Sequence, residues 1–210
     1  MNWIRSPGPA APGLRIGLLG GSFNPAHAGH LYVSQTALKR LWLNSVWWLV
    51  SPGNPLKPEQ DMAPFAARLR TARDIAKHAP RIHVSGLEAM LGTRYTIDTV
   101  KALRRRFPGL QFVWLMGSDN LLQFDRWRRW QELARLISIA VVKRPGSVMA
   151  SLNAAPIRRF GQVRDIRALM HPPAVTVLDG ARNRESATRL RALGRRAGLG
   201  TATKLMLDFI

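Results

Sequence analysis

Two histidines stand three residues apart in the stretch GLLGGSFNPAHAGHL, which spans residues 17–31. His27 and His30 follow the glycines Gly20 and Gly21, where an apolar run gives way to helical spacing. Side chains three residues apart share one face of a helix, and a helix N-terminus presents unpaired N–H groups and a partial positive charge. Imidazoles placed there can donate to phosphate oxygens and offset charge that develops during group transfer. The stretch therefore predicts a phosphate-handling loop.

Other interpretations of this loop are weaker. A structural turn with two surface histidines would not explain the whole pattern, and no third Cys, Asp or Glu ligand stands near the pair to complete a metal site. The loop also lacks the GxGxxG and GxxxxGK[ST] phosphate-binding patterns. We find no Ser/His/Asp set and no paired carboxylates of the kind that hydrolysis uses. The chain has no cysteine, which excludes disulfides and thiolate metal sites.

The elements that must position this loop are predicted from apolar runs. Six runs resemble strands, at 15–20, 46–51, 81–86, 111–117, 137–143 and 175–179. Most are apolar at nearly every residue, as is typical of strands covered on both faces of a parallel sheet. Helical spacing lies between them, at 27–43, 64–78, 97–107, 125–136 and 186–196. This alternation predicts an α/β fold with a doubly wound, mainly parallel sheet in a single domain.

The remaining segments are less regular. Residues 146–167 are rich in Ala and Arg and are expected to form a helix with loose ends. Residues 1–14 are rich in Pro and Gly and are expected to form a flexible N-terminal tail, not a signal peptide, leaving 15–210 as the domain, with a C-terminal helical region. No apolar run approaches the roughly 20 residues that span a bilayer. A soluble, cytoplasmic protein is the expectation, in keeping with the absence of cysteine.

The formal charge of +20 suggests an anionic partner. Nucleic acid, anionic lipid and phosphorylated small molecules all fit such a field, and so does a surface of solvated arginines. A nucleic-acid-binding protein would show affinity that falls steeply with salt. That interpretation gives the histidine loop no role, so it ranks below a phosphate-transfer enzyme.

In doubly wound sheets, ligands bind beyond the carboxyl ends of the strands. The segments that follow predicted strands are therefore expected to meet in one pocket. They are 20–30, 52–57, 117–119, Arg144 and 183–191.

The motif GGSFNPAHAGH at 20–30 resembles the signature of the HxGH nucleotidyltransferase superfamily. Within it, the chain is similar to the bacterial nicotinate-nucleotide adenylyltransferases from Arg15 onward. The resemblance implies a Rossmann-like nucleotidyltransferase fold and adenylyl transfer from ATP to nicotinate mononucleotide in NAD biosynthesis. The products would be nicotinate adenine dinucleotide and pyrophosphate. His27 and His30 would be catalytic, and Mg²⁺ would arrive on the ATP phosphates rather than in a protein cage.

The resemblance also implies two sets of substrate contacts. The expected ATP-binding residues are Gly20, Gly21, Ser22, Phe23, His27, His30, Gly117, Asp119, Ser186, Thr188 and Arg191. The expected residues for nicotinate mononucleotide are Ser22, Phe23, Lys57, Tyr95, Thr96, Trp127 and Arg144. Trp127 would stack on the pyridine ring. Three positions depart from the family pattern: Leu56 replaces His, Glu185 replaces Ile, and Ala187 replaces Ser.

Several of these residues also have structural interpretations. Lys57 and Arg144 could be surface or structural cations, and Thr96 and Ser186 could be ordinary helix N-caps. Phe124, Trp127 and Trp130 recur at three-residue spacing, which also suits core packing. We expect the core role for Phe124 and Trp130 and the ligand role for Trp127.

The expected partners are ATP and nicotinate mononucleotide, with no membrane and no specific nucleic acid. A homo-oligomer stays open. The main alternatives are related transferases whose acceptor is nicotinamide mononucleotide or phosphopantetheine. The sequence separates the acid from the amide only through the resemblance.

Overall fold

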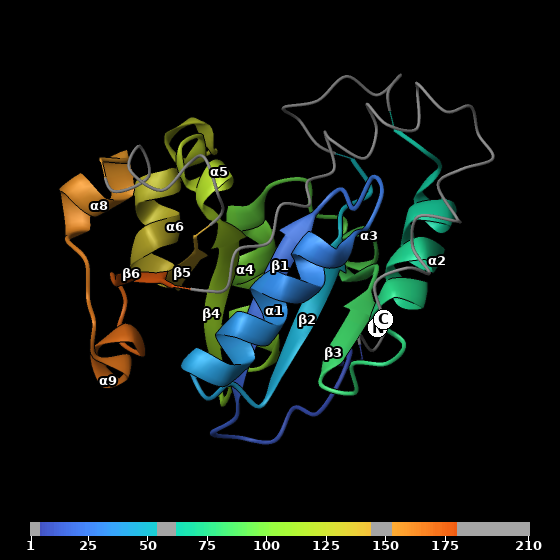
Figure 1. Cartoon of the computed structure of the whole chain (residues 1–210), viewed down its shortest axis with the longest axis horizontal. Helices are drawn as coiled ribbons and strands as arrows, with labels where there is room; N and C mark the ends of the chain where they lie inside the picture. Colours follow the sequence, from blue (N-terminus) through green and yellow to red (C-terminus); the bar gives the residue numbers. More distant parts are fainter. Residues whose placement is uncertain (1–4, 54–61, 144–152, 180–210) are drawn as a thin grey trace.

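Six parallel strands form one sheet in the order β3-β2-β1-β4-β5-β6 (Figure 1). The computed structural model describes residues 5–53, 62–143 and 153–179. The strands are β1 (Arg15–Gly21), β2 (Ser45–Val50), β3 (Ile82–Ser85), β4 (Gln111–Gly117), β5 (Ser138–Val142) and β6 (Val175–Leu178). All six were predicted from their apolar runs, and the doubly wound parallel sheet is confirmed.

The strand order reverses between β1 and β4. From β1 the chain builds outward to β3, then crosses back to add β4 on the other side of β1. Neighbouring connections therefore leave the carboxyl ends of β1 and β4 in opposite directions, and ligands of such sheets bind at this point. The strands end there at Gly21 and Gly117. The predicted phosphate loop begins at this point, after β1.

Helices cover both faces of the sheet (Figure 1). They are α1 (Ala28–Arg40), α2 (Phe65–Ala76), α3 (Leu87–Leu91), α4 (Thr96–Arg106), α5 (Ser118–Leu121), α6 (Trp130–Leu136), α8 (Ala155–Phe160) and α9 (Ile166–Leu169), with a 3₁₀ turn η2 (Phe124–Arg126). One apolar cluster joins the sheet to α1, α2 and α9. The other joins it to α3, α4 and α6.

Strand β2 shows why the sheet needs both layers. All six of its residues are buried, and its adjacent tryptophans point to opposite faces. Trp47 packs edge-on against Phe107 and Phe112, whereas Trp48 stacks on Phe23. Removing about 200 Å² per indole from water contributes on the order of 5 kcal/mol each. A strand with this pattern is stable only at the centre of a two-sided fold.

Two predicted helices differ from the observed elements. The helix expected at 125–136 is interrupted, because η2 ends at Arg126, Trp127 is extended, and Arg129 has a φ of 53° before α6 begins. The single helix expected at 146–167 is absent from the described part of that range. There, α8 ends at Phe160 and is followed by Gly161, whose φ is 74°. Helix α9 starts at Ile166, and the side chain of the preceding Asp165 accepts the N–H of Arg167. The short helices α3 and α5 were not predicted. The helix expected at 186–196 lies outside the described residues.

Residues 5–14 lie against the domain, although a flexible tail was expected there (Figure 1). Gly8 sits so close to the ring of His83 that a Cβ would lie 2.3 Å from it. The N–H of Gly13 donates to the carbonyl of Gly109 at 2.8 Å, and Leu14 packs on the core. The absence of a side chain at Gly8 allows this close approach to His83, and the flexibility of residues 1–14 stays a prediction. Among the described residues, no helix is both long enough and apolar enough to cross a membrane.

Candidate active site

His27 is the N-cap of α1, and its ring takes part in the cap. Its Nδ1 accepts the N–H of Gly29 at 3.0 Å, and its own N–H donates to Nδ1 of His30 at 3.2 Å. This reciprocal pattern is a capping box in which imidazoles replace the usual hydroxyl and carboxylate. The two rings lie 4.0 Å apart between centroids. The helix start therefore sets the mutual position of both side chains.

The hydrogen bonds also select the tautomer of each ring. A nitrogen that accepts a backbone N–H cannot carry a proton at the same time. Since Nδ1 is the acceptor in both His27 and His30, each neutral ring holds its proton on Nε2. Each Nε2–H is then a hydrogen-bond donor at the N-terminus of a helix. Both donors suit an anionic oxygen.

Aromatic side chains pack against the histidine pair, His27 and His30. The rings of Phe23, His30 and Trp48 form a triangle of mutual contacts. The Phe23 centroid lies 4.6 Å from that of His30 and 5.1 Å from that of Trp48, and the His30 and Trp48 centroids lie 5.8 Å apart. Its side chain is buried, and its φ of 46° is unusual for a bulky residue. The buried ring of Phe23 packs against His30, and the expected contact of Phe23 with substrate stays a prediction.

A buried hydrogen-bond chain ties this group of rings to the sheet. Trp48 Nε1 donates to Ser34 Oγ at 2.7 Å, and Ser34 Oγ donates to the carbonyl of His30 at 2.9 Å. Both donors are buried, so each bond also avoids the cost of leaving a polar group unpaired. Strand β2 therefore fixes the first turn of α1. His27 is only 3% exposed, whereas His30 is half-buried, which leaves His30 the more accessible ring.

The two glycines before the loop have different neighbours. A Cβ at Gly20 would lie 2.5 Å from the ring of Trp114 on β4. At Gly21 the nearest atom to a Cβ is a ring carbon of Phe23, at an ordinary 3.7 Å. Gly20 is thus required by packing within the protein. Packing within the protein does not require glycine at position 21, so the absence of a side chain there leaves space for a ligand.

Trp114 connects the glycine loop to Trp127. The Trp127 ring meets Trp114 edge-on at 6.0 Å and packs on Phe124 at 5.1 Å. Trp127 stays half-buried, while Phe124 is fully buried and Trp130 packs edge-on against it. The core role expected for Phe124 is confirmed. Trp127 and Trp130 are both partly buried against the same core cluster, and the ligand role of Trp127 stays a prediction.

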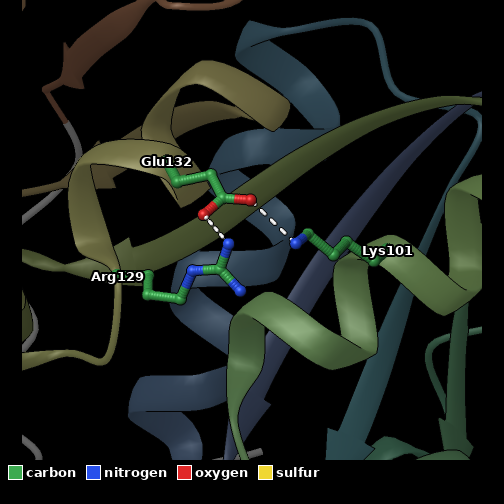
Figure 2. Close-up of polar contacts among 3 residues, drawn as sticks. All are labelled: Lys101, Arg129 and Glu132. Carbon is green, nitrogen blue, oxygen red and sulfur yellow. Dashed lines mark ion pairs between the residues drawn. The ribbon is translucent and has the colours of Figure 1, made fainter.

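An ion-pair triad holds the turn that carries Trp127. Glu132 accepts from Lys101 at 2.7 Å and from Arg129 at 2.5 Å, as Figure 2 shows. Lys101 belongs to α4, and the other two residues flank the start of α6. These cations lower the pKa of the Glu132 carboxyl, the hydrogen bond from Lys101 being the main cause. The triad links the left-handed residue Arg129 to α4.

Tyr95 and Thr96 begin α4, close to this turn. The guanidinium of Arg128 lies 4.5 Å from the centroid of the Tyr95 ring. Thr96 was considered as an N-cap, but it is the first helical residue and the N-cap is Tyr95, without a side-chain cap bond. This cation–π contact joins Arg128, which follows Trp127, to Tyr95, which precedes Thr96. It therefore brings the two segments together.

A buried polar cluster supports the same helix start and was not predicted. The hydroxyls of Thr93 and Thr99 lie 2.8 Å apart, and Thr99 donates to the carboxyl of Glu88 at 3.4 Å. Burial raises the pKa of Glu88 to about 7, with the Thr99 bond opposing that shift. Glu88 and Thr99 are 11 residues apart, so no local capping pattern indicated this contact, and the burial of Glu88 depends on α3, which was not predicted.

Arg68 was also missed, although it braces two site loops. It is 3% exposed, and burial lowers its pKa. Its guanidinium donates to the backbone carbonyls of Ser22, Ser51, Pro52 and Ala63 at 2.5, 2.8, 2.9 and 2.8 Å. It therefore ties the loop after β1 to the loop after β2. Arg68, Ala72 and Ala76 follow one another at intervals of four residues on the buried face of α2. This helical spacing was the signal that could have indicated the burial of Arg68.

The other expected residues fall into two groups. Gly117 is buried at the end of β4 as the N-cap of α5, and Asp119 is exposed in the first turn of that helix. Outside the described residues lie Lys57, Arg144, Ser186, Thr188 and Arg191, with the divergent Leu56, Glu185 and Ala187. In the described ranges, no three His, Asp or Glu side chains gather in a way that could hold a metal ion.

Comparison with known proteins places these features in a family. The model of the cytidylyltransferase-like family matches residues 18–193. A protein of Parvibaculum lavamentivorans, named as a nicotinate-nucleotide adenylyltransferase, is 49% identical over 189 residues, covering 87% of this chain and 94% of its own. One of Cereibacter sphaeroides with the same name is 50% identical over 184 residues, covering 86% and 98%.

Solved structures resemble the fold at lower identity. The nicotinic acid mononucleotide adenylyltransferase of Plasmodium falciparum, complexed with NaAD, superposes with a TM-score of 0.68. It covers 91% of this chain and 89% of its own, at 17% identity. A second structure of that enzyme, complexed with APC, gives a TM-score of 0.64 at 17% identity, covering 85% and 83%. At this identity the likeness concerns the fold.

Proposed function

The chain belongs to the cytidylyltransferase-like family, and from that premise we propose that it is a nicotinate-nucleotide adenylyltransferase of NAD biosynthesis. It transfers the adenylyl group of ATP to nicotinate mononucleotide. The observation that carries the proposal is the pair of imidazoles at the start of α1, which follows β1 at the point where the strand order reverses between β1 and β4. Near 50% identity over most of both chains supports the same activity.

The reaction joins two phosphates that are already ionised. An oxygen of the mononucleotide phosphate attacks the α-phosphorus of ATP, a new P–O bond forms, and the bond to the β-phosphate oxygen breaks. Pyrophosphate leaves with that electron pair. Because the nucleophile is an anion, no general base is required, and catalysis consists of alignment and charge stabilisation. Mg²⁺ would be carried by the phosphates of ATP, where it would offset part of their negative charge.

We assign the transition-state contact to His30 and a supporting contact to His27. The Nε2–H of His30 donates to an oxygen of the α-phosphate, where negative charge grows during the transfer. The α1 N-terminus adds its partial positive charge. Gly21 lets backbone approach the nucleotide, and Asp119 contacts the ribose or the adenine side.

Trp127, Tyr95 and Thr96 are assigned to the pyridine nucleotide. The half-buried Trp127 ring offers a stacking face, and the start of α4 offers N–H groups for the nicotinate carboxylate. The contact between Arg128 and Tyr95 supports a shared subsite, because it joins the two segments. Lys57, Arg144, Ser186, Thr188 and Arg191 remain proposed phosphate contacts on the family resemblance alone.

The test uses the purified full chain with ATP, Mg²⁺ and nicotinate mononucleotide. We expect nicotinate adenine dinucleotide and pyrophosphate in equal amounts, measured by chromatography and a coupled pyrophosphate assay. Parallel reactions contain nicotinamide mononucleotide or phosphopantetheine as the acceptor. Faster turnover with either alternative acceptor would replace the assigned substrate, and no pyrophosphate with any of them would refute adenylyl transfer.

A further inference from the structure

A cavity opens at the amino ends of β1 and β4, opposite the end of the sheet that carries the histidine loop. It has a volume of about 730 Å³, and its walls include Arg15, Gln111, Arg164, Arg167, Trp42 and Met170. Arg15 is the first residue of β1, whereas Gly21 at the other end leads into the histidine loop. Six residue steps at about 3.3 Å separate these ends by roughly 20 Å. A ligand in this cavity would not touch the site described above.

The cavity is strongly cationic. Three guanidinium groups line it against one carboxylate, that of Asp165, with His171 also in the wall. The Asp165 carboxylate already accepts the N–H of Arg167 at 2.9 Å as the cap of α9. Guanidinium groups offer paired, planar donors that match phosphate oxygens. The charge of this wall therefore favours a phosphorylated ligand.

Trp42 gives the cavity an aromatic wall. It is 71% exposed, although the residues on both sides of it, Leu41 and Leu43, are buried. Its φ of 48° is a left-handed conformation, which at the end of a helix usually belongs to Gly or Asn. A bulky residue held in that conformation is strained, and burial of its own ring does not offset the strain. A ligand ring stacked on the indole would supply the missing contact.

We propose that this cavity is a second binding site, specific for a nucleoside phosphate whose base stacks on Trp42 and whose phosphate meets Arg164 and Arg167. Base–aromatic stacking tolerates any base, because every base has a π-face. The exposed amide of Gln111 can meet the polar edge of that base. The volume suits one nucleotide unit. The unit can belong to a free nucleotide or to a single strand, and both present the same chemistry.

The test measures binding of fluorescein-labelled hexathymidylate by anisotropy and binding of AMP by calorimetry. Both use the full chain saturated with nicotinate adenine dinucleotide, which occupies the adenylyl-transfer site. We expect the wild type to bind at least one of these ligands. Trp42→Ala should weaken that binding at least fivefold, and Arg164→Ala/Arg167→Ala at least tenfold. Trp42→Gly, which suits the left-handed turn, should match Trp42→Ala and excludes a folding defect as the cause.

The control is Arg70→Ala/Arg73→Ala, which removes the same charge from the exposed surface of α2. It should change the affinity less than twofold. Binding of AMP would identify a free nucleotide as the ligand, and binding of the hexamer alone would identify a strand. Equal weakening by both double variants, no effect at Trp42, or no binding of either probe would overturn the proposal. All cavity variants should keep the wild-type rate of adenylyl transfer. That result would show that binding at the cavity is independent of the proposed function.

Discussion

The backbone N–H of His27 donates to Nδ1 of His30, and the two imidazole rings lie 4.0 Å apart. The same side chains that we assign to catalysis therefore also cap the helix that carries them. This double use makes simple alanine variants ambiguous, because loss of a cap costs about 1 kcal/mol on its own. The variants below separate the two roles.

His30→Ala should lower kcat by roughly a hundredfold or more, because it removes a donor to the α-phosphate in the transition state. Loss of the acceptor for the His27 N–H should cost about 1 kcal/mol of stability. Steady-state kinetics and thermal unfolding measure the two effects. The control is His78→Ala, an exposed histidine that should leave both unchanged. Near-normal turnover in His30→Ala would contradict the mechanism.

His27→Ser should retain the helix cap while losing the Nε2–H. A serine hydroxyl at an N-cap accepts the same class of backbone N–H, so the melting temperature should stay within a few degrees of the wild type. We expect kcat to fall at least tenfold, because a donor near the phosphate is gone. His27→Ala should add a stability loss of about 1 kcal/mol. If His27→Ser keeps full kcat, the His27 ring serves only as a cap.

Trp127→Ala should raise the Michaelis constant for nicotinate mononucleotide at least tenfold and that for ATP less than threefold, since stacking contributes roughly 1–3 kcal/mol. Trp130→Ala is the matched control, another half-buried tryptophan that packs on Phe124. It should reduce stability and leave the ratio of the two constants unchanged. Equal rises for both substrates in Trp127→Ala would identify this residue as part of the core.

Gly20→Ala and Gly21→Ala should have opposite consequences. A methyl group at Gly20 meets Trp114 at 2.5 Å and should destabilise the fold by about 1–3 kcal/mol. A methyl group at Gly21 meets only an ordinary contact at 3.7 Å, so the fold should tolerate it. We expect Gly21→Ala to raise the Michaelis constant for ATP while its melting temperature stays unchanged. Wild-type kinetics in that variant would show that substrate does not approach Gly21.

Glu88→Gln should remove a pH dependence of stability. Burial raises the pKa of Glu88 from 4.5 to about 7 in the folded protein. Its stabilising contribution is therefore full below pH 4.5, declines as the pH rises, and is lost above about 7. The total change is on the order of 3 kcal/mol. Urea titrations at pH 4.5, 6 and 8 should show the wild type losing stability relative to Glu88→Gln. A constant difference would mean that Glu88 titrates normally.

The sequence by itself determined the sheet, most of its helices and the helix start that carries His27 and His30. Apolar runs such as Val46–Trp47–Trp48 are local signals, because a strand covered on both faces must be apolar at nearly every position. The pattern around His27 and His30 is also local, since a helix start and its cap lie within four residues. Such features need no knowledge of distant parts of the chain.

Only the tertiary structure decided which distant groups meet. Gly20 requires its size because of Trp114, and Trp127 leaves its helix in a turn held by Glu132. Arg68 and Glu88 carry charges that sequence reasoning normally assigns to solvent, and their burial depends on carbonyls and hydroxyls supplied by other segments. Contacts of this kind depend on chain crossings and on the desolvation that follows from them. A local pattern of residue types shows neither where the chain crosses nor which groups lose contact with water.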